Sequence, residues 1–284
     1  MSEIIAVVGA GTMGSGIAQV AVEAGFKVNL VDTEQAFVDR GLANIKKFMG
    51  KKVEKGKITQ AQCDDIFSRL TGTTDMAAAV KGAIMVVEAV FEKVELKKEI
   101  FQKLDSLCPP KTILASNTST LSITGLAAAT KYPERVIGTH YFSPVPAMRL
   151  VEVIRGKQTS DETTDKTVAI CKKFGKTPIV VKDIPGFIVN RFLCLLYNEA
   201  ANMVLNGSAS AEDIDQAVKL GCNWPMGINE IADLAGIDVT YNAIQAMYDM
   251  TGEERYKPSP LWMKILKENR LGRKNGRGFY EYKP

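Results

Sequence analysis

A glycine-rich turn near the start of the chain constrains its fold more than any other feature. Residues 4–8 form a short apolar run rich in β-branched side chains, and residues 9–14 read G-A-G-T-M-G, which is a G-x-G-x-x-G pattern. Apolar residues then recur at helical spacing over 17–24, and a second apolar run over 28–31 ends in Asp32. A strand, a glycine turn, a helix, a strand and an acidic residue in this order predict a βαβ unit of a parallel sheet.

The positions of the three glycines fit the binding of a dinucleotide. Gly9 permits the tight turn, Gly11 lets the backbone approach a pyrophosphate, and Gly14 lets the helix pack close to the strand. The N–H groups and the dipole at the helix start favour phosphates. Asp32 follows Gly14 by eighteen residues, near the roughly 20 expected for a carboxylate that accepts from a ribose hydroxyl.

Because this carboxylate would repel a 2′-phosphate, we expect NAD rather than NADP. The expected cofactor-binding residues here are Gly9, Ala10, Gly11, Thr12, Met13, Gly14 and Asp32. The alternative is a glycine turn in an unrelated βαβ unit.

The composition bounds the class of protein. With 284 residues, 46% of them hydrophobic, the chain is long enough for about two domains of roughly 150 residues each. A net charge of +4 gives no case for nucleic-acid binding, no apolar run reaches the roughly 18 residues of a membrane span, and no secretory signal precedes the first strand. Five cysteines without C-x-x-C spacing fit reduced thiols, and a single histidine argues against a zinc site. We therefore expect a cytoplasmic protein without a metal.

Strand and helix patterns alternate along the first part of the chain and then stop. A boundary containing Pro and Gly at 182–186 is followed by helical patterns alone, beginning with a long, largely apolar helix over 187–205. We predict an α/β Rossmann-type NAD-binding domain at 1–183 and an all-helical C-terminal domain at 184–284. The helix over 187–205 is too apolar for a solvated surface, so we expect it to be buried between domains or subunits. The basic, glycine-rich tail at 272–280 is either a turn before packed aromatic residues or a segment that reaches back to the cofactor.

Polar side chains follow several predicted strands at the end where open α/β sheets bind their ligands. Glu92 lies just past the buried run 83–90, and residues 116–119 read S-N-T-S after another strand. His140, the only histidine, ends a further strand, and Glu152 is the nearest acid downstream, across a proline-containing turn. A pKa near 6.5 suits a base that takes a hydroxyl proton as hydride leaves, so His140 is the candidate base if the chain is a dehydrogenase. The alternatives are a helix N-cap for the S-N-T-S run, a structural histidine and an exposed carboxylate.

Lysines cluster near the end of the helix predicted over 33–55. They are Lys46, Lys47, Lys51, Lys52, Lys55 and Lys57, with Glu54 as the only acid among them. Such runs are usually solvated helix faces, and from the residues alone we favour that interpretation. The alternative is a patch that attracts a phosphorylated ligand.

Five separated motifs resemble those of the 3-hydroxyacyl-CoA dehydrogenase family, and the resemblance extends over essentially the whole chain. Within that family, the bacterial 3-hydroxybutyryl-CoA dehydrogenases look most similar. The motifs are V-G-A-G-T-M-G at 8–14, A-S-N-T-S at 115–119, H-Y-F-S-P-V-P at 140–146, L-V-E-V-I at 150–154, and G-K-T-P at 175–178 running on to P-G-F-I-V-N-R at 185–191. Five motifs in order are far more specific than the glycine turn alone.

The resemblance implies a role for individual residues. His140 matches the catalytic histidine and Glu152 the glutamate that orients it, while Ser119 and Asn190 match the polar residues that hold the substrate oxygens. Lys52 falls where the family places a lysine on the coenzyme A phosphates, with Lys51 or Lys55 as alternatives. Ser143 stands where many members carry Asn beside the nicotinamide, and Ile228-Asn229 where Pro and an aromatic are common. The residues that match the lining of the NAD site are Glu92, Lys97, Asn117, Ser119, Ser143 and Lys274.

The resemblance further implies reversible, NAD-dependent oxidation of (S)-3-hydroxybutyryl-CoA to acetoacetyl-CoA, as in fatty acid and butanoate metabolism. It implies a homodimer or larger homo-oligomer, with the helical domain contributing to the substrate cleft and to dimerisation. One alternative is a β-hydroxyacid dehydrogenase of the hydroxyisobutyrate type, which shares the domain plan but uses a lysine base. The other is an NAD-binding protein without catalytic activity.

Overall fold

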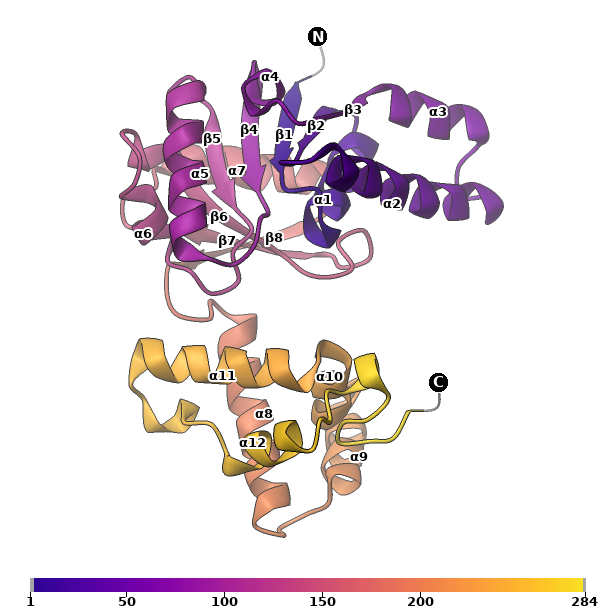
Figure 1. Ribbon diagram of the computed structural model, residues 1–284, viewed down its shortest axis with the longest axis vertical. Coiled ribbons are helices and arrows are strands. Elements are labelled where there is room, and N and C mark those ends of the chain that lie inside the picture. The colour runs from indigo at the N-terminus through magenta and orange to yellow at the C-terminus, as the bar shows by residue number, and fades with distance from the viewer. Residues whose placement is uncertain (1–2, 283–284) are drawn as a thin grey trace. The chain divides into compact units, whose positions relative to one another are not determined.

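The structure is a computed structural model that describes residues 3–282 and divides into two compact units, one ending at Ile184 and one beginning at Pro185 (Figure 1). The first unit is an α/β domain and the second is all-helical. No helix of the described residues is both long and apolar enough to cross a bilayer.

The first unit is built on one eight-stranded sheet. Its strands are β1 (Ile4–Val8), β2 (Lys27–Val31), β3 (Leu70–Thr73), β4 (Ala83–Glu88), β5 (Ile113–Ser116), β6 (Val136–Tyr141), β7 (Leu150–Arg155) and β8 (Thr177–Lys182). They lie in the order β3-β2-β1-β4-β5-β6-β7-β8, and every neighbouring pair is parallel except β6 and β7. The first six strands have the order of a doubly wound dinucleotide-binding sheet. Strands β7 and β8 continue the sheet beyond β6 and run antiparallel to the first six strands.

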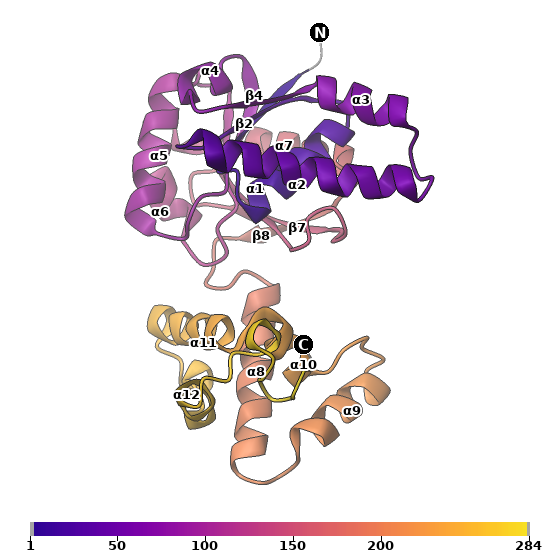
Figure 2. The same ribbon diagram turned by 45° about the vertical axis from the view of Figure 1, so that its right-hand side comes forward.

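Helices cover both faces of this sheet. They are α1 (Thr12–Glu23), α2 (Gln35–Glu54), α3 (Gln60–Ser68), α4 (Met76–Val80), α5 (Val94–Leu107), α6 (Ile123–Ala127) and α7 (Asp161–Lys173), with a short 3₁₀ turn at Pro133–Arg135. Helices α1 and α7 pack on one face, whereas α4, α5 and α6 pack on the other (Figures 1 and 2). Because both faces are covered, the central strands are continuous apolar runs, and Ile5, Val7, Met85 and Val87 have no exposed surface.

The second unit is a bundle around α8 (Val189–Leu205). The other helices are α9 (Ala211–Gly221), α10 (Ile228–Ala235), α11 (Ile237–Thr251) and α12 (Pro260–Lys267), with 3₁₀ turns at Glu254–Tyr256 and Arg273–Asn275. One face of α8 enters the core that also contains Tyr256 and Trp262. On its other face, Phe192 is 64% exposed and Leu196 is 39% exposed. The apolar character of α8 is therefore only partly explained by packing within one chain.

The C-terminal tail is bonded to this bundle. The buried carboxylate of Asp233 on α10 accepts hydrogen bonds from the backbone N–H groups of Phe279 and Tyr280 and from the hydroxyl of Tyr282. The ring of Phe279 packs edge-on against Trp262, at 5.7 Å between ring centroids. Within the helical unit, the glycine-rich tail is a turn that precedes packed aromatic residues.

Candidate active site

The carboxyl end of β6 and the start of β7 bring the only histidine and an acid together. In the antiparallel pairing of these strands, His140 lies directly opposite Glu152. Side chains directly opposite on neighbouring strands point to the same face of a sheet. His140 Nδ1 lies 2.7 Å from Glu152 Oε2, and the side chains are only 6% and 1% exposed. A buried carboxylate at this distance fixes the ring orientation and stabilises a positive charge on the imidazole.

The loop after β5 carries Ser119 and is held by Glu92. The Glu92 carboxylate accepts from the backbone N–H of Ser119 at 2.8 Å and of Thr120 at 3.0 Å, and also from the hydroxyl groups of Thr118 and Thr120. Burial by itself would raise the pKa of Glu92, but the neighbouring Lys97 ammonium and these hydrogen bonds outweigh it and lower the pKa. Glu92 is therefore an ionised anchor for the Ser119 loop. The N-cap of α6 is Ser122 rather than a residue of the S-N-T-S run.

Lys97 lies behind this anchor in a buried network. Its ammonium group pairs with Glu88 at 2.6 Å and with Glu92 at 3.3 Å, and its side chain is 1% exposed. Glu88 is fully buried at the end of β4 and also accepts from the Ser116 hydroxyl at 2.6 Å. Lys97, which the resemblance places in the lining of the NAD site, is thus satisfied by two carboxylates.

Asn117 ties the ends of β5 and β6 together. Its backbone N–H donates to the Glu88 carbonyl at 2.8 Å, and its side-chain oxygen accepts from the backbone N–H of Tyr141 at 2.9 Å. Tyr141 follows His140 directly, so Asn117 fixes the strand end that carries the histidine. Ser143 comes two residues later, at the start of the loop that leads to β7.

The glycine turn has the stereochemistry that its sequence predicts. Gly9 has a φ of +103°, and a Cβ there would lie 2.6 Å from the carbonyl oxygen of Ala89. A Cβ on Gly14 would lie 1.7 Å from the Gly9 carbonyl oxygen, which excludes any side chain. A Cβ on Gly11 would meet no protein atom within 4 Å, so the space beside Gly11 is open for a ligand. Gly11 caps α1 without a side-chain hydrogen bond, which leaves the helix start suited to a phosphate.

A cavity of about 270 Å³ adjoins this turn at the carboxyl ends of β1 and β2. Asp32 lines it, and the apolar side chains of Met76, Leu96 and Ile100 form part of its wall. Asp32 accepts from the backbone N–H of Ala10 at 2.7 Å, which joins the acidic residue to the glycine turn. An apolar slot beside a carboxylate and a glycine turn fits the adenosine half of a dinucleotide.

Comparison with known proteins assigns the family. Residues 4–184 match the model of the 3-hydroxyacyl-CoA dehydrogenase NAD binding domain, and residues 186–282 match that of the 3-hydroxyacyl-CoA dehydrogenase C-terminal domain. The chain belongs to the 3-hydroxyacyl-CoA dehydrogenase family. The matches confirm the predicted family, the Rossmann-type fold with a helical C-terminal domain, and NAD as the cofactor.

Individual members of the 3-hydroxyacyl-CoA dehydrogenase family are similar over nearly their full length. The chain is 45% identical over 278 residues to the probable 3-hydroxybutyryl-CoA dehydrogenase of Bacillus subtilis, covering 98% of this chain and 96% of that protein. It is 41% identical over 285 residues to the human mitochondrial hydroxyacyl-coenzyme A dehydrogenase, covering 98% and 91%. The crystal structure of the (S)-3-hydroxybutyryl-CoA dehydrogenase PaaH1 from Ralstonia eutropha has a TM-score of 0.96 to it at 41% identity, with complete coverage of both chains.

The remaining residues expected from the family resemblance belong to α2 and to the helical unit. Lys52 on α2 is bonded to Glu23 at 2.7 Å, whereas Lys55, at the C-cap of α2, has no ion pair among the described residues. Asn190 is the second residue of α8, and Lys274 is ion-paired with Asp238 in the helical unit. Asn229, one of the departures from the family pattern, is buried and bonded to Asp215 of α9, so its role is in packing.

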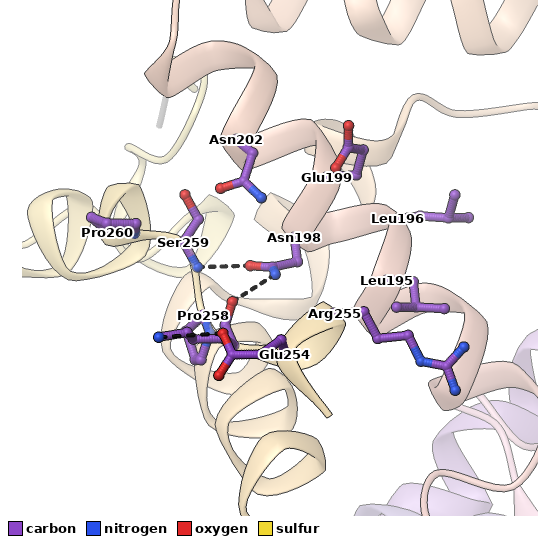
Figure 3. A pocket seen from close by; sticks show the side chains of 11 residues that line it. Leu195, Leu196, Asn198, Glu199, Asn202, Glu254, Arg255, Pro258, Ser259 and Pro260 are labelled. Atoms are coloured by element: carbon purple, nitrogen blue, oxygen red, sulfur yellow. Dashed lines mark hydrogen bonds and ion pairs between the residues drawn. The ribbon is translucent and has the colours of Figure 1, made fainter. Parts of the chain in front are cut away.

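The helical unit contains a separate cavity of about 570 Å³ between α8 and the segment 254–260 (Figure 3). Asn198 lies on its wall, and its side chain bonds to the carbonyl of Lys257 at 2.8 Å and to the N–H of Ser259 at 2.7 Å. None of the expected catalytic or cofactor residues lines this cavity.

Glu88 is a member of the buried network behind Glu92 that the sequence did not single out. The signal was present, because Glu88 is the one charged residue inside the apolar run over 83–90 and stands where a parallel strand ends. Lys176 lies in the G-K-T-P motif, and the sequence pattern indicates no role for it.

Proposed function

We propose that this protein catalyses the reversible NAD-dependent oxidation of (S)-3-hydroxybutyryl-CoA to acetoacetyl-CoA. The observation that carries the proposal is the buried His140–Glu152 pair at the sheet edge that also carries the glycine turn and the Ser119 loop. NAD, when bound, accepts hydride from C3 of the substrate. The protein must then remove the hydroxyl proton and stabilise the oxygen.

His140 is the proposed general base. Its Nδ1 is bonded to Glu152 at 2.7 Å, so we propose that Nε2 accepts the proton of the C3 hydroxyl. The Glu152 carboxylate holds the ring and stabilises the imidazolium that results. In the reducing direction, the imidazolium returns the proton to the C3 oxygen. General acid–base catalysis of this kind contributes about 10²–10⁴-fold to the rate.

Ser119 and Asn190 are the proposed oxygen-binding residues. The Ser119 hydroxyl donates to the C3 oxygen, and the backbone of Ser119 is anchored for this by Glu92. Asn190, contributed by the helical unit, donates its amide to the thioester carbonyl. The support for this assignment is the match of both residues to the family motifs. Because Asn190 contacts the ester rather than C3, Asn190→Ala is expected to raise KM for acetoacetyl-CoA more than it lowers kcat.

The cofactor contacts carried over from the family are proposed with the geometry that supports each. Gly9 to Gly14 and Asp32 bind the pyrophosphate and a ribose, while Asn117 and Ser143 flank the nicotinamide. Glu92 and Lys97 shape this edge from the side of β4, and Lys274 is assigned to the cofactor by its match to the family. Among the described residues, Lys51 and Lys55 have no ion-pair partner, whereas Lys52 is already bonded to Glu23, so we favour Lys51 or Lys55 for the coenzyme A phosphates.

The test is the loss of absorbance at 340 nm with acetoacetyl-CoA and NADH, repeated with NADPH and with free acetoacetate. We expect rapid turnover of the CoA ester with NADH and at least about tenfold less with NADPH, because Asp32 repels a 2′-phosphate. Preference for the free acid would instead support a β-hydroxyacid dehydrogenase. A folded protein that binds NADH without turnover of either substrate would contradict the proposal.

We also propose that the protein acts as a cytoplasmic homodimer or larger homo-oligomer assembled through its helical unit. The support is the exposure of Phe192 and Leu196 on α8, which leaves an apolar surface in the single chain. The five cysteines are all free thiols, which fits a reducing compartment. Light scattering at micromolar concentration tests the assembly, and a monomeric mass would contradict it.

A further inference from the structure

The loop between β6 and β7 is held by a buried lysine from elsewhere in the chain. Lys176 precedes β8, and its ammonium group donates to the backbone carbonyl of Val145 and, at 2.8 Å, to that of Met148. Lys176 is only 8% exposed. Among the described residues it forms no ion pair, so these two carbonyls are its hydrogen-bond acceptors.

A buried ammonium is costly unless its donors are satisfied. Burial lowers the pKa of Lys176, an effect that the nearby Glu23 opposes. A hydrophobic residue could fill the same volume without that cost, but it could not fix two carbonyls of an irregular loop. The contacts of Lys176 therefore determine the path of residues 143–148.

The opposite side of the same loop rests on the helix that follows the glycine turn. Val145 is 2% exposed, and a Cβ added to Gly16 of α1 would lie 2.9 Å from the Val145 Cβ. The loop is thus clamped between the Lys176 ammonium and α1. Any displacement of Val145 changes the spacing between the loop and the cofactor-binding helix.

An open space borders this contact. A cavity of about 250 Å³ lies between α1, α2 and residues 144–146 of the loop, and Thr12, in the first turn of α1, lines it. Ser143 precedes this wall, and His140 lies three residues earlier on β6. The loop therefore connects the candidate base, the expected nicotinamide contact and one wall of a cavity beside the pyrophosphate turn.

We infer that Lys176 is a positioning residue for the dehydrogenase site, acting through the loop 143–148 that it holds against α1. The inference rests on the proposed function for its kinetic consequences, but its effect on NADH binding does not require turnover. Without Lys176 the loop loses the two hydrogen bonds at Val145 and Met148. Ser143 and the cavity wall formed by residues 144–146 are then no longer fixed beside the cofactor-binding turn. A lysine with a purely structural role would lower stability and leave the affinity for NADH unchanged.

The test compares Lys176→Met with Lys173→Met, a matched control on the exposed surface of α7, where Lys173 pairs with Glu3. NADH binding is measured by fluorescence titration, and KM and kcat by the 340 nm assay. For Lys176→Met we expect the Kd and KM for NADH to rise about fivefold or more, the effect of losing one net hydrogen bond, with a smaller change in kcat. Lys173→Met is expected to behave as the wild type.

A folded Lys176→Met protein with wild-type Kd and KM for NADH overturns the inference. If Lys176→Met does not fold, Gly16→Ala is decisive, because its methyl group pushes Val145 from the other side. We expect Gly16→Ala to raise the Kd for NADH in the same way. A folded Gly16→Ala protein with unchanged affinity would show that the loop does not control the site. Absence of turnover in the wild type would contradict the proposed function alone, since the binding comparison would still stand.

Discussion

Replacement of Glu152 by Gln isolates the charge of the catalytic pair. The substitution keeps the size of the side chain and an oxygen that can accept from His140 Nδ1, but it removes the negative charge. The two groups are 2.7 Å apart and almost fully buried, so solvent screens their interaction little. A hydrogen bond to a charged group contributes about 1.5–3 kcal/mol. Because about 1.4 kcal/mol corresponds to tenfold in rate, kcat should fall about 10- to 150-fold.

The assay is steady-state reduction of acetoacetyl-CoA at saturating NADH, accompanied by NADH titration and thermal unfolding. The affinity for NADH should stay within about twofold, because Glu152 contacts His140 rather than the glycine turn. The matched control is Glu95→Gln, whose side chain is 75% exposed and which should retain wild-type kcat. A folded Glu152→Gln enzyme with a kcat within threefold of the wild type would refute the role assigned to the pair.

Three further perturbations follow from the same geometry. Gly14→Ala places a methyl group 1.7 Å from the Gly9 carbonyl oxygen, so NADH binding in a fluorescence titration should be abolished. Lys97→Met leaves Glu88 buried without its counter-charge and should lower the free energy of unfolding in urea by about 3–5 kcal/mol. Because the folded-state pKa of Glu92 is lowered, its ionised form stabilises the fold above the usual carboxyl pKa, and this stabilisation is lost as the pH falls through the folded-state value. Glu92→Gln should therefore weaken the dependence of stability on pH below the ordinary carboxyl pKa of 4.5.

Each of these three substitutions is compared with a control variant. Gly50→Ala is the control for the glycine turn, since a Cβ there meets no atom within 4 Å, and NADH affinity retained by Gly14→Ala would contradict the steric reasoning. Lys98→Met removes an exposed neighbour of Lys97 and should change stability by less than about 0.5 kcal/mol. Equal effects of Lys97→Met and Lys98→Met would argue against a buried ion pair. If the stability of Glu92→Gln falls with decreasing pH as steeply as that of the wild type, Glu92 is not ionised more readily in the folded state.

Local patterns in the sequence predicted the longer elements well. The helix predicted over 33–55 contains α2, and the apolar run over 83–90 contains β4, because amphipathic and continuous apolar patterns extend over these lengths. The five-residue helices α4 and α6 were not predicted, since one turn is too short for periodicity to be detected. Their caps, Asp75 and Ser122, are visible only once the chain direction around them is known.

The sequence by itself determined the glycine turn, the alternation that builds a parallel sheet and the change to an all-helical second unit, because each depends on residues close together in the chain. It also offered His140 and Glu152 as a pair, since both are unusual residues within apolar strands. Only the tertiary structure decided that they face each other in register, and that Lys97 lies between Glu88 and Glu92. The hold of Lys176 on the loop thirty residues before it was likewise decided by the fold. These contacts join residues on different strands, helices and loops. Which of them meet is set by the register of the strands and the path of the chain between them, which no local pattern encodes.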